Sequence, residues 1–214
     1  MKKFITLMSF SRGNSFKEVS YTAVNNSLLR YDKLTRFPII HVINAYAQKG
    51  EEIKIICILP DSPLCLENYK YLPIELEALS KDKGFHYEII PIKVANSPNL
   101  AACLDLFQKL LNNLDEDDTV YACLTYGLKT MPIVMLTAIQ YANSTFQRLS
   151  VDCIVYGELY SRNRKSSEPD EILKGSIHDI TALIQINELA GLLAEKKVSN
   201  PKEIIKQILT NPDA

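Results

Sequence analysis

With 214 residues, 47% of them hydrophobic and 23% charged, the chain can bury the core of one substantial domain, which excludes disordered, fibrous and disulfide-rich miniature proteins. The formal net charge of -1 excludes a globally basic protein that coats DNA, so a polyanionic partner has to meet a local patch. Five cysteines without a C-x-x-C pair indicate reduced thiols and no zinc site. No run approaches the roughly 18 apolar residues of a membrane helix, which favours a cytoplasmic location without membrane contact.

Short β-rich runs alternate with longer helical patterns, which predicts an α/β fold with a Rossmann-like, mostly parallel sheet and helices on both faces. The expected strands cover residues 4–10, 53–60, 87–94, 119–126 and 151–160. The expected helices cover residues 36–48, 66–81, 100–114 and 131–146. Pro132 suits the first turn of the last of these helices, because that turn accepts proline.

Two regions interrupt this alternation. Residues 17–34 alternate only in part and carry Asn25-Asn26-Ser27, which predicts a small hairpin inserted after the first strand. Residues 161–174 are polar and indicate a surface loop or linker. A short strand in GSIHDIT and two C-terminal helices, from about residues 183 and 201, are expected after it. We therefore expect a ligand-binding domain over residues 1–160, which residues 161–214 complete or extend.

Two polar loops follow expected strands. Ligands of open α/β sheets bind at the carboxyl ends of strands, near the point where strand order reverses. The first loop (residues 9–14) consists of Ser9, Phe10, Ser11, Arg12, Gly13 and Asn14. The second loop (residues 125–130) consists of Thr125, Tyr126, Gly127, Leu128, Lys129 and Thr130, and it enters the helix at Pro132. Each loop combines hydroxyl groups, a glycine and one positive charge, a set suited to phosphate.

The side chains of these loops point to a nucleotide. Arg12 offers a planar two-pronged contact to phosphate, and Lys129 offers a compact charge with three donors. Phe10 and Tyr126 offer faces on which a base can stack. The plainer alternative is that both loops are ordinary strand-to-helix turns capped by hydroxyl groups.

Other familiar sites are missing from the sequence. Neither the dinucleotide fingerprint G-x-G-x-x-G nor the P-loop pattern occurs, which excludes the usual NAD and ATPase motifs. His41, His86 and His178 form no H-E-x-x-H pair, and no G-x-S-x-G elbow is present. His41 is expected to be a core or partly exposed histidine. The acidic run at residues 115–118 is expected to be a solvated turn at the opposite end of the sheet.

The segments MSFSRGNSFKEVSY and CLTYGLKTMPIVM together resemble the CARF (CRISPR-associated Rossmann fold) domain. The segments IVYGELY and GSIHDIT extend the resemblance to about residue 193. The chain departs from the family pattern at Cys123, where an acidic residue is expected, and at Thr130, where a proline is common. The second motif is fairly specific, whereas the first alone is weak.

The resemblance implies a homodimer that senses cyclic oligoadenylate in type III CRISPR antiviral defence, with no cofactor and no metal. Cyclic tetra-adenylate is the preferred ligand, because its four phosphates suit a two-fold pocket, and cyclic hexa-adenylate is the alternative. The residues implied as contacts of the ring are Ser11, Arg12, Gly13, Thr125, Tyr126, Gly127 and Lys129.

Two functions follow from the resemblance. In the favoured one, the ligand shifts a dimer equilibrium that regulates a fused or associated effector, and the chain is an excised or a stand-alone sensor domain. In the alternative, the protein is a ring nuclease in which a ribose 2'-OH attacks the adjacent phosphate without metal. Ser11 would then orient the reacting group and Lys129 would stabilise developing charge, although the loops hold no general base. A third reading is an unrelated α/β interaction protein that binds no nucleotide.

Overall fold

The computed structural model describes residues 1–12, 16–160, 172–196 and 199–210. The chain divides into two compact units, Met1–Asp179 and Ile180–Ala214. In the second unit, α6 (Ala182–Glu195) contacts α7 (Pro201–Thr210), so the two expected C-terminal helices are confirmed. None of the helices in the described ranges has both the length and the apolar character that crossing a bilayer requires.

Within the described residues, the first unit contains one sheet of seven strands in the order β2-β7-β6-β5-β1-β3-β4. Its strands are β1 (Lys2–Leu7), β2 (Val19–Ala23), β3 (Glu52–Pro60), β4 (His86–Val94), β5 (Thr119–Cys123), β6 (Ser150–Leu159) and β7 (Leu173–Asp179). The five strands from β6 to β4 run parallel, whereas β7 is antiparallel to β6 and carries β2 as its parallel neighbour. The predicted α/β class and mostly parallel sheet are confirmed.

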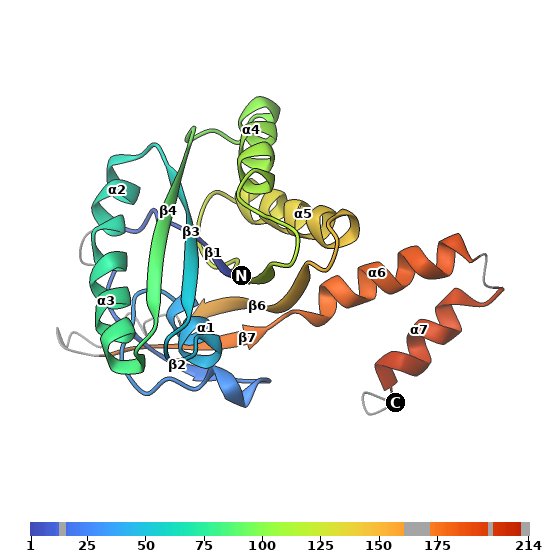
Figure 1. Cartoon of the computed structure of the whole chain (residues 1–214), viewed down its shortest axis with the longest axis horizontal. Coiled ribbons are helices and arrows are strands. Elements are labelled where there is room, and N and C mark those ends of the chain that lie inside the picture. The colour runs from blue at the N-terminus through green and yellow to red at the C-terminus, as the bar shows by residue number, and fades with distance from the viewer. Residues whose placement is uncertain (13–15, 161–171, 197–198, 211–214) are drawn as a thin grey trace. The chain divides into compact units, whose positions relative to one another are not determined.

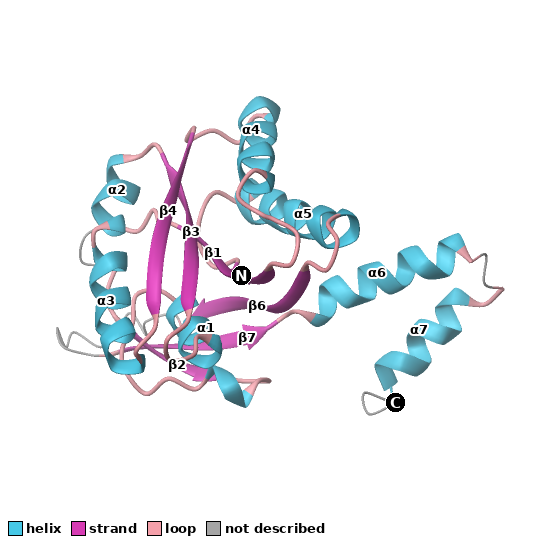
Figure 2. Cartoon of the chain, in the orientation of Figure 1, coloured by secondary structure: helices cyan, strands magenta, loops and turns pink. Residues whose placement is uncertain are grey.

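Helices cover both faces of this sheet (Figures 1 and 2). One face carries α1 (Ile39–Tyr46), α2 (Pro63–Tyr69) and α3 (Tyr71–Lys83), and the other carries α4 (Leu100–Leu111) and α5 (Thr130–Thr145). Residues that alternate along a strand point to opposite faces, so a strand covered on both faces has to be apolar throughout. In β3, Ile55 and Cys57 join the core beneath α1 to α3, while the equally buried Ile56 and Ile58 point to the opposite face.

The helix expected over residues 66–81 is two helices, α2 and α3, which meet at Lys70. Pro73 explains the break. A proline has no N–H to donate to the carbonyl four residues earlier, here that of Tyr69, and its ring crowds that carbonyl. The sequence prediction was therefore right about helical structure and wrong about its continuity.

The hairpin expected over residues 17–34 is not confirmed, because Val19 meets Thr35 in an isolated antiparallel bridge and not in a ladder. The segment contributes one strand, β2, whose ladder partner is β7, and a short 3-10 turn follows at Ser27–Leu29. Asn25 and Asn26 explain the pairing, because both side-chain amides donate to Asp179 at the end of β7, each over 2.7 Å. Of the polar segment at residues 161–174, residues 161–171 lie outside the described residues, and β7 begins at Leu173.

The acidic run at residues 115–118 is not simply a solvated turn. The side chain of Asp118 is only 3% exposed, and it pairs with the equally buried Lys3 ammonium at 2.6 Å. Lys3 also contacts Asp115 at 2.7 Å and holds the pKa of that carboxyl below its usual range by hydrogen bonding and charge. This ion-pair cluster joins the start of β1 to the start of β5 at the amino edge of the sheet, where the parallel strands begin.

Candidate functional site

The two predicted loops lie at the point where the strand order reverses. β1 pairs with β3 on one side and with β5 on the other, so the carboxyl ends of β1 and β5 are neighbours at the carboxyl edge, where the parallel strands end. The first loop leaves β1 there and the second loop leaves β5 there. In open α/β sheets this reversal point is where ligands bind.

The first loop is held by its own hydroxyl groups and by α2. The buried Ser9 hydroxyl donates to Ser11 Oγ over 3.0 Å and accepts from the Ser11 N–H over 3.1 Å. The Asn68 side chain, itself only 2% exposed, donates to the carbonyls of Ser9 and Ser11 at 2.9 and 2.8 Å. Arg12, which follows these hydrogen-bonded residues, is exposed. Gly13 and Asn14, both predicted site residues, lie outside the described residues.

The second loop is tied to β6 through Thr125. Its hydroxyl oxygen accepts from the Gly157 N–H over 2.8 Å and lies 3.0 Å from Cys123 Sγ. Burial raises the pKa of the Cys123 thiol, so this group is neutral where the resemblance expects an acid. At Gly157 a Cβ atom would lie 2.6 Å from Pro38 Cγ, so the backbone here has to be glycine. Strand β5 ends at Cys123, earlier than the predicted residue 126.

Tyr126 anchors the same loop from the α1 side. Its hydroxyl donates to the Arg36 carbonyl over 2.6 Å, and its ring meets Phe16 edge-on at 6.0 Å. Burial, together with the nearby Tyr21 hydroxyl, raises the pKa of Tyr126 well above its usual range, so it acts as a neutral donor. Phe10 also packs partly buried against this core. Stacking of a base on either ring stays a prediction.

Gly127 brings the second loop against β1. Its φ of +94° is a left-handed conformation that other L-residues rarely adopt. A Cβ atom at this position would lie 3.1 Å from Leu7 Cδ2 and 3.4 Å from Met131 Cβ. Because Leu7 is the last residue of β1, this approach brings the two loops together within one chain.

The second loop ends at the N-terminus of α5. Helix α5 runs over 16 residues from Thr130, and no side chain caps its first turn. The free N–H groups and the helix dipole favour an anion at such an end. Lys129 is exposed immediately before it, while Leu128 and Thr130 are half-buried and the Leu128 carbonyl accepts from the Met131 N–H.

Sequence reasoning missed two residues that shape the site. Asn68 was read only as part of a helix, although a polar side chain on the apolar face of a helix signals a buried hydrogen bond. Arg36 was read as the start of a helix, whereas its guanidinium bonds Glu75 at 3.1 Å and Glu18 at 2.9 Å and lies 4.3 Å over the Tyr71 ring. Its charge is thus already balanced by two carboxylates beneath the second loop.

Neither the protein-family models nor the curated proteins compared with the chain give a match. Across the described ranges, no three His, Cys, Asp or Glu side chains are grouped as metal ligands would be. The fold and the site define a class, namely a Rossmann-like α/β protein with two polar loops at its strand-order reversal. Serine hydroxyl groups, a helix N-terminus and two exposed basic side chains form the chemistry of this site.

Proposed function

We propose that this chain is a CARF sensor domain of type III CRISPR antiviral defence that binds cyclic oligoadenylate, preferably cyclic tetra-adenylate, in the cytoplasm. The observation that carries the proposal is the convergence of the first and second loops at the reversal point of the sheet. These are the two segments on which the family resemblance rests. Every loop that follows a parallel strand leaves at this edge, but these two leave neighbouring strands at the reversal point, where open α/β sheets bind ligands.

The chemistry of the edge supports an anionic ring as the ligand. Arg12 and Lys129 are exposed there, and the uncapped N-terminus of α5 adds donors that carry no formal charge. Arg12 suits a two-pronged phosphate contact, and Lys129 suits a point contact. Although the net charge of the chain is -1, the positive charges gathered at this edge can attract a polyanion locally.

A homodimer is supported by exposed apolar side chains on the packed helices α4 and α5. Leu100 and Leu104 of α4 and Ile133 of α5 are exposed, and an edge contact of 5.8 Å between Phe107 and Tyr141 joins the two helices. Apolar side chains that gather on a protein surface mark interaction sites. Ile133 lies in the first turn of α5, beside Lys129, so a second copy bound here brings two copies of the site together for one ring.

In this proposal ligand binding shifts the dimer equilibrium, and helices α6 and α7 pass the shift to a fused or associated effector. A ligand shifts such an equilibrium only by its difference in affinity for the two states.

A thermal-unfolding experiment tests the proposal. Purified protein is heated with cyclic tetra-adenylate, with cyclic hexa-adenylate and with linear tetra-adenylate as the control for charge. We expect the four-membered ring to raise the melting temperature most, because ligands that bind only the folded state stabilise it by mass action. Equal shifts with the linear control would indicate non-specific binding, and no shift with either ring would refute the proposal.

The alternative function is cleavage of the same ring. It needs a general base, which neither loop supplies. A cluster of titratable side chains on β6 and β7 favours this alternative, and it is described next.

A further inference from the structure

Ser176 and His178 of β7 and Glu158 of β6 form a hydrogen-bonded cluster outside both loops. Ser176 Oγ lies 2.7 Å from His178 Nε2 and 3.4 Å from Glu158 Oε2. The same Glu158 oxygen lies 3.6 Å from His178 Nε2. The register of the sheet produces this grouping, because Glu158 faces Ser176 directly across the antiparallel ladder and His178 is two residues further on.

The cluster lies on the face of the sheet that carries α5. Val155 and Ile177 belong to the core beneath α1, and a Cβ atom at Gly157 would meet Pro38 on that same side. Side chains alternate along a strand, so Glu158, Ser176 and His178 point to the opposite face. The second loop passes to that face when it enters α5.

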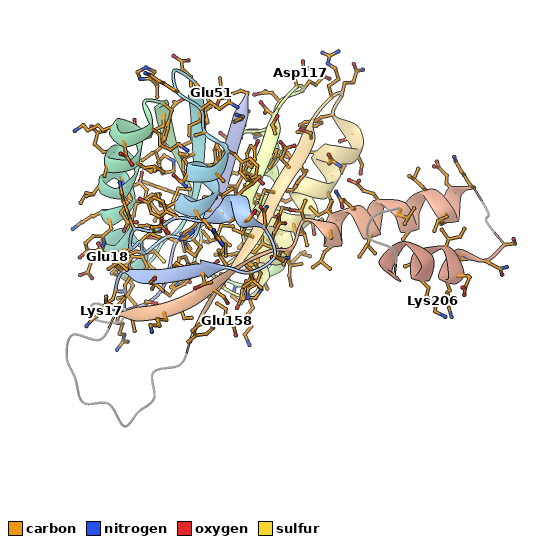
Figure 3. The ribbon with its side chains drawn as sticks, turned by 90° about the horizontal axis from the view of Figure 1, so that it is seen from below. Lys17, Glu18, Glu51, Asp117, Glu158 and Lys206 are labelled. Atoms are coloured by element: carbon orange, nitrogen blue, oxygen red, sulfur yellow. The ribbon has the colours of Figure 1, made fainter. Side chains whose placement is uncertain are left out.

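The cluster is also close to the carboxyl edge. The Gly157 N–H, one residue before Glu158, donates to Thr125 of the second loop over 2.8 Å. Only β6 separates β7 from β5, and two strand spacings amount to about 10 Å, well within the width of a ring of four nucleotides. Figure 3 shows Glu158 at the opposite end of the sheet from Glu51 and Asp117, which mark the amino edge.

The hydrogen bonds favour one arrangement of protons. When the Ser176 hydroxyl donates to Glu158, its oxygen accepts from His178 Nε2–H, and this tautomer leaves the lone pair of the imidazole on Nδ1. Ser176 is only 1% exposed, whereas the His178 side chain is 34% exposed. A buried hydroxyl thus orients a partly solvent-exposed histidine ring, and the Glu158 carboxylate lies close enough to stabilise an imidazolium.

We infer that His178 is the general base of a ribonuclease activity at this site, oriented by Ser176 and Glu158; the inference rests on the proposed binding of cyclic oligoadenylate. His178 Nδ1 takes the proton of a ribose 2'-OH, the 2'-oxygen forms a bond to the adjacent phosphorus, and the bond from phosphorus to the 5'-oxygen breaks. The 5'-oxygen takes a proton from water. The ring opens to a linear chain with a 2',3'-cyclic phosphate and a 5'-OH, without a redox partner.

Single-turnover cleavage of cyclic tetra-adenylate tests the inference, with products separated by chromatography and identified by mass. The wild type, His178→Ala and His86→Ala are compared, and the affinity of each for the ring is measured by calorimetry. His86 is the matched control, because it is an exposed histidine at the start of β4, on the amino edge.

We expect His178→Ala to bind the ring with unchanged affinity and to cleave it roughly 10²- to 10⁴-fold more slowly, the usual contribution of a general base. Added imidazole should restore part of the rate of His178→Ala, which a merely structural role would not allow. The His86→Ala protein should cleave like the wild type. If His178→Ala lowers the melting temperature, His178→Gln, whose side-chain amide can still donate to Ser176 from the position of Nε2, takes its place.

Each other outcome is decisive. Binding of the ring by the wild type without cleavage overturns the role of His178 and leaves the sensor function intact. Equal rates for the wild type and for His178→Ala also overturn it. Failure of the wild type to bind any ring removes the proposed function and the inference together.

Discussion

Replacing Gly127 with alanine tests whether the second loop has to approach β1 as closely as the structure shows. Two costs add at this position. The left-handed backbone costs an L-residue about 1–2 kcal/mol, of which about 0.4–1 kcal/mol is recovered because alanine restricts the unfolded chain. The new Cβ atom lies 3.1 Å from Leu7, which is fully buried and cannot retreat, and such overpacking costs about 1–3 kcal/mol.

Gly50 provides the matched control. Its φ of +78° is also left-handed, but a Cβ atom there meets nothing within 4 Å. We therefore expect Gly50→Ala to lower the free energy of unfolding by about 1 kcal/mol and Gly127→Ala by about 2–4 kcal/mol. The difference between the two variants isolates the contact with β1.

Urea unfolding at 25 °C measures both free energies, and titration with cyclic tetra-adenylate measures the effect on the site. Gly127→Ala should weaken ligand binding because it separates the two loops, whereas Gly50→Ala should not. Equal losses of stability in the two variants, or unchanged binding by Gly127→Ala, would refute the reasoning about this close approach.

Three further predictions concern the first loop, the ion pair at the amino edge and a buried histidine. Asn68→Ala should lower the free energy of unfolding by about 1–3 kcal/mol, because the Ser9 and Ser11 carbonyls lose the amide donor and the Ser9 carbonyl keeps only the weak Cys65 thiol. Calorimetry should show weaker binding of the ring, and an unaltered affinity would mean that the bonds from Asn68 are dispensable. Lys3→Met should cost up to about 3–5 kcal/mol in urea unfolding, because the buried Asp118 carboxylate keeps only the partly exposed N-terminal ammonium of Met1, at 3.3 Å, as a charge partner. The double variant with Asp118→Leu should recover most of this loss, and additive effects of the two substitutions would contradict the pairing. Burial lowers the pKa of His41 below the ordinary 6.5, so the unfolded chain binds more protons as the pH falls below that value. The wild type should then lose up to about 1.4 kcal/mol per pH unit relative to His41→Gln, and parallel pH profiles in urea unfolding would contradict it.

The sequence predicted the fold because apolar runs such as that of β3 are direct consequences of a sheet covered on both faces. It also predicted that residues 9–14 and 125–130 follow strands that end at one edge. The pairing of distant strands was harder to predict. The side chains of β2 alternate between buried and exposed as in one arm of a hairpin, but its partner β7 lies about 150 residues away. The structure shows this pairing in the backbone ladder, and the bonds from Asn25 and Asn26 to Asp179 reinforce it.

The inner part of the site was also beyond sequence reasoning. Asn68 and Arg36 act through contacts between elements that are far apart in the chain. The pattern of a single sequence does not show which distant residues lie close together in space. The Ser176, His178 and Glu158 cluster has the same origin, since it depends on the register of β6 against β7. His178 lies in no H-E-x-x-H pair, so the sequence alone assigns it no role. Side-chain alternation within a known register would have grouped these three residues.

Calorimetric titration with cyclic tetra-adenylate tests the central claim most directly. We predict saturable binding of one ring per two chains, and at least a roughly ten-fold loss of affinity for Lys129→Ala, because charged hydrogen bonds contribute about 1.5–3 kcal/mol each. Lys81→Ala, which removes an exposed lysine on α3, should bind like the wild type. Absence of saturable binding, or equal affinities for the Lys129 and Lys81 variants, would contradict the account.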